Sequence, residues 1–190
     1  MDNVGEFFFS SPIDPTNLSK DWSRADDDQH HHLMINSTIN TPTGPAQTAW
    51  ERLTHDFQLS AILQAYSALP LNITSGVTTI QRSGGRPMAN STASSAAADV
   101  RSAVFIDRNA GEGPDFFSVN LRLSRSFPLG GRARAEALAE VFNLTNRQNN
   151  VQLQGNFGSG AYPTSPSTTF GQVLAVGDPR SVQLALRFKF

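Results

Sequence analysis

Residues 181–190, SVQLALRFKF, alternate strictly between apolar side chains and polar or small ones. Successive side chains of a β-strand point to opposite faces of the sheet, so a period of two indicates a strand with one apolar face. We therefore predict a strand at 180–190, with its apolar face ending on an aromatic residue. The apolar positions are Val182, Leu184, Leu186, Phe188 and Phe190.

The same alternation appears upstream, most clearly in DFFSVNLRLSRSF, where Phe117 and Leu121 fall on one face and Arg122 on the other. Residues 132–144 are rich in Ala, Glu and Arg and have good helix propensity. At helical spacing, however, they form no apolar stripe, so a strand is the better interpretation. The five predicted strands lie near residues 32–41, 55–67, 115–127, 132–144 and 180–190.

Strand length and polar faces indicate a membrane barrel. The predicted strands have about 10 to 13 residues, close to the ~9–11 residues of a tilted strand that crosses a bilayer and well above the ~5–6 residues usual in water-soluble sheets. Their charges suit a water-filled lumen better than a soluble core. We expect an all-β fold, an antiparallel up-and-down transmembrane β-barrel segment. The candidate lumen-facing charges are Arg122, Arg134, Glu136, Glu140 and Arg187.

The links between the predicted strands alternate in length. Short links such as PLGGR, residues 128–132, alternate with long ones that include residues 75–114 and 147–178. Outer-membrane barrels combine short periplasmic turns with long extracellular loops. The last strand is therefore expected to run inward, with Phe190 in a periplasmic aromatic girdle. Its expected companions are Trp50, Phe127 and Phe188.

Composition excludes several classes of protein. With 15 basic and 16 acidic residues, the chain gives no support to a nucleic-acid partner. It has no cysteine, which rules out disulfides and thiolate metal sites. No apolar run reaches the ~20 residues of a membrane-spanning helix. The N-terminus, MDNVGEFFF, begins with an acidic residue and lacks the pattern of a signal peptide.

No catalytic, cofactor-binding or metal site is predicted, so we expect a protein that is not an enzyme. In DDDQHHH, His30 and His32 would project to one side, but further ligands at metal spacing are missing, and a polar loop leading into a strand explains the motif. The glycines of SGGRP and NAGEGP are interpreted as loop turns, because neither motif forms a strand–loop–helix phosphate cradle. No Ser/His/Asp constellation is predicted, because His55 and Asp56 lie at the start of a predicted strand on the short-turn side, far from the long loops.

Several blocks, in order along the chain, resemble the C-terminal barrel of TonB-dependent outer-membrane receptors, most of all the Oar-like group with a carboxypeptidase-regulatory-like N-terminal domain. The most specific are RNAGEGPDFFSVNLRLSRSF, AEVFNLTN and DPRSVQLALRFKF. The resemblance implies a 22-stranded barrel with a plug domain and energised uptake of a large nutrient. It also implies a recognition signal for the barrel-assembly machinery, formed by Leu184, Leu186, Phe188 and Phe190.

We expect the chain to be a C-terminal piece of such a receptor, without its plug or signal peptide. Five strands, with a sixth at the extreme N-terminus, fall short of the eight that the smallest closed bacterial barrel needs. The expected partners are outer-membrane lipid and the assembly machinery, joined in the full-length parent by the plug and the TonB complex. Ligand contacts are expected from loops 75–114 and 147–178. The alternatives are a small self-contained outer-membrane barrel, acting as an adhesin or anchor, and a soluble β-sandwich binding module.

Overall fold

A computed structural model describes residues 12–190 except 46, 83 and 90, and it divides the chain into two units. One, here called the sheet unit, comprises residues 31–66, 116–149 and 177–190. The other, here called the loop unit, comprises the described part of the chain up to His30 together with residues 67–115 and 150–176. Among the described residues, no helix has the length and apolar character needed to cross a membrane.

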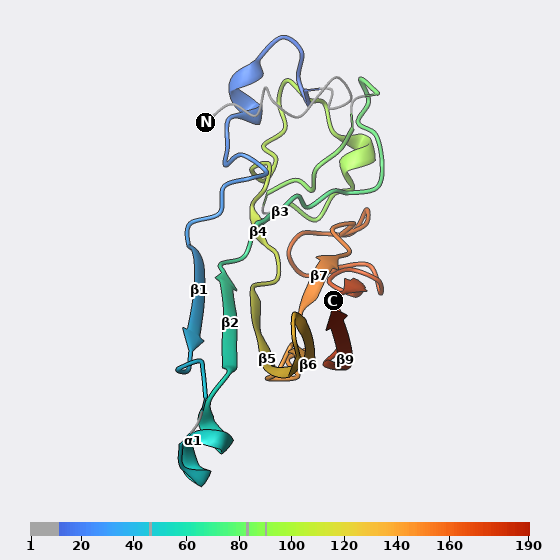
Figure 1. Cartoon of the computed structure of the whole chain (residues 1–190). Coiled ribbons are helices and arrows are strands. Elements are labelled where there is room, and N and C mark those ends of the chain that lie inside the picture. The colour runs from blue at the N-terminus through green and yellow to red at the C-terminus, as the bar shows by residue number, and fades with distance from the viewer. Residues whose placement is uncertain (1–11, 46, 83, 90) are drawn as a thin grey trace. The chain divides into compact units, whose positions relative to one another are not determined.

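The sheet unit is one antiparallel sheet of five strands in the order β1-β2-β5-β6-β9 (Figure 1). Neighbours in the sheet are successive along the unit's chain, which is the up-and-down topology predicted from the sequence. Within the described residues, β1 and β9 form the two edges and do not pair with each other, so the sheet is open. The strands are β1 (His32–Asn40), β2 (Phe57–Tyr66), β5 (Phe116–Gly130), β6 (Ala133–Phe142) and β9 (Ser181–Lys189).

Each strand of this sheet overlaps one of the five predicted ranges, and the all-β prediction is confirmed. The Ala-rich segment at 132–144 is strand β6 and not a helix. Strand β5 continues past Phe127 to Gly130, with a register irregularity between Pro128 and Gly130. The sixth predicted strand falls on residues 1–11, outside the described residues.

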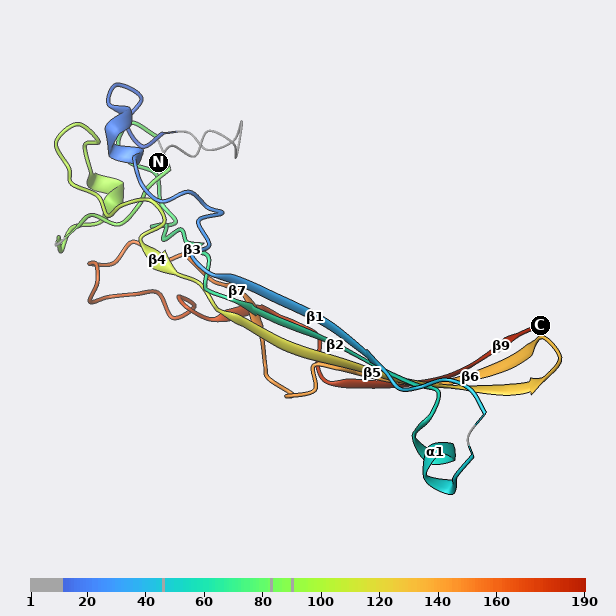
Figure 2. The same cartoon turned by 60° about the vertical axis from the view of Figure 1, so that its left-hand side comes forward.

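Two short links join strand ends on one side of the sheet (Figure 2). Gly130 and Gly131, with φ of +108° and +59°, reverse the chain between β5 and β6 in a conformation that side chains with a Cβ rarely adopt. The link between β1 and β2 contains helix α1 (Ala49–Thr54), which the periodicity did not predict. Its N-terminus is a capping box in which the Thr48 hydroxyl accepts from the Glu51 N–H and the Glu51 carboxylate accepts from the Thr48 N–H.

The long links supply the loop unit, which has a small core of its own. Phe157 lies at its centre, packed with Ile73 and Ile106 and with the rings of Tyr162 and Phe170, whose centroids are 5.0 and 5.1 Å away. The long links are therefore ordered and not structureless. Their short elements are 3-10 helices η2 (Leu18–Asp21) and η3 (Ser95–Ala97), the ladder of β3 (Pro70–Leu71) with β4 (Gly111–Glu112), and the ladder of β7 (Asn150–Leu153) with β8 (Val173–Val176).

Candidate functional site

The polar face of the sheet carries a cluster of charges on β5, β6 and β9. Glu136 lies at its centre, with one carboxylate oxygen 3.9 Å from Arg122 Nη2 and the other 3.4 Å from Arg187 Nη1. Arg122 Nε also lies 3.7 Å from Glu140 Oε1. Four of the five predicted charges thus come together through the strand register. The fifth, Arg134, occupies the same face, paired in register with Lys189 of β9.

The opposite face of the same sheet is apolar and open. In register, Leu59, Leu123, Ala139 and Leu184 cross four strands on this face. Leu184 is 76 % exposed, and large apolar side chains on β1, β2 and β5 are exposed as well. A continuous exposed apolar face opposite a charged face is typical of a barrel wall between lipid and water. The exposed members are Leu33, Ile35, Ile39, Leu59, Leu123, Phe127, Val182, Leu184, Leu186 and Phe188.

Arg125 interrupts this apolar face near the short links. Its guanidinium carbon lies 4.6 Å from the ring centroid of Phe57 and 5.1 Å from that of Phe127, and Nη2 donates to the carbonyl of Arg52. A cation held over aromatic rings is suited to the boundary between lipid and water. Phe127 was predicted for an aromatic girdle, whereas Arg125 was not singled out. The signal in the sequence was a basic residue on the apolar side of the strand, two positions before Phe127.

Two buried asparagines, which sequence reasoning missed, close the other end of β5 and β6. Asn149 accepts from the Phe117 N–H through Oδ1 and donates to the Phe117 carbonyl through Nδ2, both at 2.9 Å. Its side chain therefore pairs with β5 as a strand backbone would. Asn143 donates from Nδ2 to the carbonyls of Arg147 and Asp178, at 2.8 and 3.1 Å. The block AEVFNLTN, residues 139–146, contains Asn143 and was noted only for its resemblance, and Asn149 follows it by three residues.

A row of rings crosses the same end of the sheet on its polar face. His32 contacts Tyr66 edge-on at 4.1 Å between ring centroids, and Tyr66 stacks on Phe116 at 5.4 Å. The other histidine of the predicted motif, His30, lies 3.4 Å from Asp28 in the loop unit. Across the described ranges of the chain, no three potential metal ligands gather at one point.

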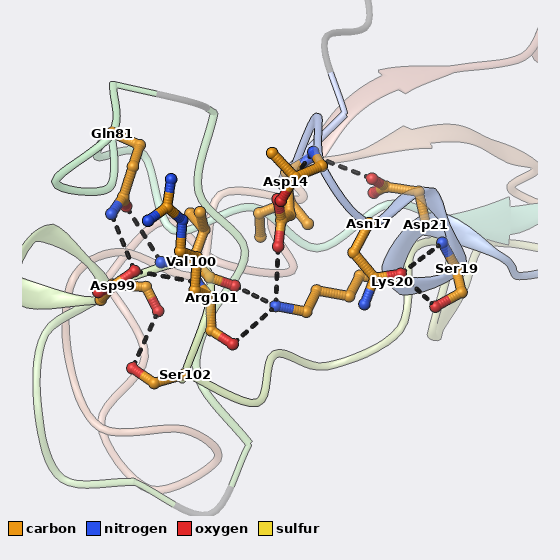
Figure 3. A network of polar contacts seen from close by, with 12 residues as sticks. Asp14, Asn17, Ser19, Lys20, Asp21, Gln81, Asp99, Val100, Arg101 and Ser102 are labelled. Carbon is orange, nitrogen blue, oxygen red and sulfur yellow. Dashed lines mark hydrogen bonds and ion pairs between the residues drawn. The ribbon is translucent and has the colours of Figure 1, made fainter.

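The loop unit is held together by a polar network between η2 and residues 99–102 (Figure 3). Lys20 Nζ donates to Asp14 Oδ2 at 3.0 Å and to the carbonyls of Val100 and Arg101. Asp99 accepts from Gln81 Nε2 at 2.8 Å, and Gln81 in turn accepts from the Val100 N–H at 3.0 Å. The network joins segments about eighty residues apart, so it fixes the shape of the loops.

The buried carboxylate of Asp14 makes this network sensitive to acid. Hydrogen bonds from the side chain of Thr16 and from Lys20 lower the pKa of Asp14 from 3.8 to about 2. A carboxyl whose pKa is lower in the folded state stabilises the fold above its unfolded pKa. This stabilisation is lost as the pH falls from about 4 through 2.

We expect Asp14→Asn to be less stable than wild type at neutral pH and the gap to close as the pH falls through that window. The measurement is urea unfolding at several pH values, followed by the fluorescence of Trp22, which adjoins η2, in a Trp50→Phe background. A gap that stays constant down to pH 2 would show that the Asp14 carboxylate is not the titrating group.

Together, the antiparallel sheet, its exposed apolar face and its charged opposite face define the wall of a transmembrane β-barrel. A family model described as "Outer membrane beta barrel domain" matches residues 1–183. The chain therefore belongs to this family of outer-membrane barrels. Comparison with curated proteins and with solved structures gave no match.

Proposed function

We propose that the chain is part of the barrel of a TonB-dependent receptor that takes up or binds a large nutrient at the outer membrane. The observation that carries this proposal is the combination of an open five-stranded sheet with a large ordered loop unit built from the long links. Ligand-binding residues are commonly carried by loops on a rigid scaffold, and the ordered loop unit provides such loops.

The open edges of the sheet support a larger barrel. In lipid, an unpaired backbone N–H or C=O costs several kcal/mol, so β1 and β9 need partner strands. The resemblance noted in the sequence supplies them as the remaining strands of a 22-stranded barrel with an internal plug. The charge cluster around Glu136 would then face the plug, and salt bridges of this partly exposed kind contribute about 0–1 kcal/mol each.

The last strand is proposed as the signal for the barrel-assembly machinery. Leu184, Leu186 and Phe188 share the apolar face of β9, and Phe190, which follows the strand, is 95 % exposed. An edge strand with a free hydrogen-bonding side is a ready template for pairing with another strand. Partners of this proposal are outer-membrane lipid, the assembly machinery and, in the full-length receptor, the TonB complex; catalysis has no part in it.

Cysteine labelling tests the proposal, because the chain has no native cysteine. Single cysteines would replace Ser102 in the loop unit, Arg132 in the β5–β6 turn and Gln183 on the polar face of β9. In intact cells, a bulky membrane-impermeant maleimide is expected to label position 102 only. After the outer membrane is permeabilised, position 132 should be labelled too, while position 183 stays protected by the plug.

Three outcomes would count against the receptor. Rapid labelling at position 183 in intact cells would indicate an unplugged, self-contained barrel. Labelling at position 132 before permeabilisation would show that the β5–β6 turn faces the outside of the cell, opposite to the proposed orientation. Recovery of the protein from the soluble fraction, without detergent, would favour the β-sandwich alternative.

A further inference from the structure

Arg86 is a buried cation of the loop unit with unused hydrogen-bond donors. It belongs to the SGGRP motif, and its side chain is 7 % exposed. Nη2 donates to the Lys20 carbonyl at 2.8 Å and lies 3.1 Å from Asp21 Oδ1. Nε and Nη1 are shielded from solvent and find no acceptor among the described residues.

Burying the Nε and Nη1 donors of Arg86 without acceptors is unfavourable. A guanidinium has five N–H donors in a fixed planar fork, and a buried donor without an acceptor destabilises a fold. Burial lowers the pKa of Arg86, although the nearby carboxylate of Asp21 opposes that change. Buried polar groups without protein partners are usually satisfied by water or by a ligand.

A cavity of about 430 Å³ adjoins Arg86 and has a second arginine in its wall. Arg108, from the segment that contains the NAGEGP motif, lines the cavity and lies 3.2 Å from Asp26 Oδ2. Asp21 is the one carboxylate in the described lining, and the carboxylate of Asp26, which pairs with Arg108, lies outside it. The remaining polar side chains of the lining belong to Asn72, Thr74 and Thr78.

The backbone beside Arg86 leaves no room for a side chain. A Cβ at Gly85 would lie 2.4 Å from the Val77 carbonyl oxygen and 2.5 Å from Ser75 Oγ. Glycine at this position, directly before Arg86 in the chain, therefore allows two backbone segments to approach closely. The motif that was interpreted as a plain loop turn thus positions a buried arginine at the wall of a cavity.

We propose that this cavity binds an oxyanion, the carboxylate or phosphate group of a ligand, through Arg86 and Arg108. The fork of a guanidinium matches two oxygens of either group, and Arg86 has two donors for which the described residues supply no acceptor. This inference deepens the proposed receptor function by naming the chemical class of the receptor's ligand. Only the biological role of the anion site rests on the proposed function. The anion site itself can be tested on the purified protein.

Calorimetric titration with inorganic phosphate and, separately, with acetate provides the test. The protein would be held folded in detergent micelles at low salt, and a preference for one probe identifies the oxyanion. Arg108→Gln and Arg86→Lys are each expected to weaken binding about tenfold or more, as for the loss of a charge-assisted hydrogen bond. Arg101→Gln, an exposed exchange outside this cavity, should bind like wild type.

The site would be refuted if neither probe binds to the wild type. Equal weakening by Arg101→Gln and Arg108→Gln would refute it too, because binding would then reflect overall charge. Should Arg86→Lys fail to fold, Arg108→Gln decides the question alone, since its side chain is less buried and at the cavity wall. If the purified protein binds the anion but a cysteine at position 183 is labelled in intact cells, the receptor proposal would be refuted and the anion site would stand.

Discussion

Leu121→Arg is expected to lower the unfolding free energy of the sheet by about 2–4 kcal/mol, the cost of a charge on the lipid face near the middle of a bilayer. Leu121 pairs in register with Ala61 of β2 and with Val141 of β6, on the apolar face and four residues from Arg125 at the boundary. An arginine there would have to leave the water that it occupies in the unfolded chain. The measurement is urea unfolding of the protein refolded into lipid vesicles.

Gln183→Arg is the control, because it adds the same side chain at a similar depth on the other face. Gln183 pairs in register with Glu140, a member of the charge cluster. We expect a change within about 0.5 kcal/mol, as for most exposed substitutions. Equal losses of unfolding free energy in the two variants would mean that one face of the sheet does not meet lipid while the other meets water. The interpretation of the sheet as a barrel wall would then be wrong.

The sheet was predictable from the sequence because every residue of a barrel wall meets one of two environments. Alternation therefore runs through 180–190 and, apart from Arg125 on the apolar face, through 117–127. In 132–144 it outweighs the helix propensity. The predicted strand 115–127 stops before Pro128, because proline lacks a backbone donor and is found mainly at bulges and edges of sheets. The strand continues to Gly130 with an irregular register at that point.

The charge cluster was predictable as a face but not as a set of contacts. Alternation alone assigned Arg122 and Glu136 to the polar side. Their approach to 3.9 Å depends on the register of β5 against β6, which pairs Arg122 with Glu140 and Ser126 with Glu136. Register is set by the turn at Gly130–Gly131, and periodicity within one strand carries no information on it.

The loop unit could not be predicted, because polar contacts between distant residues determine much of it. Arg108 reaches Asp26 over a separation of 82 residues, and Asn109 Nδ2 donates to the carbonyl of Arg24 over 85. No periodic pattern marks such contacts in a sequence rich in small polar residues. The cavity beside Arg86 escaped notice for the same reason.

The two buried asparagines at the end of β6 show how the sheet passes into a long link. Strand β6 ends at Phe142, and Phe117 of β5 is left without a backbone partner on that side. Asn149 takes the place of the missing strand with its side-chain amide, while Asn143 ties the chain to the segment that enters β9. Both asparagines are buried.

Asn149→Leu is expected to lower the unfolding free energy by about 1–3 kcal/mol, because it leaves the N–H and C=O of Phe117 without partners in a buried place. Leucine is close in size, so the loss reflects the hydrogen bonds and not the packing volume. Hydrogen exchange of the Phe117 amide gives a local measurement, with faster exchange expected in the variant. Gln152→Leu makes the same amide-to-leucine exchange at an exposed position and should change neither quantity. If the Phe117 amide stays as protected in Asn149→Leu as in wild type, the side chain does not replace a strand, and the end of β5 must be held by other contacts.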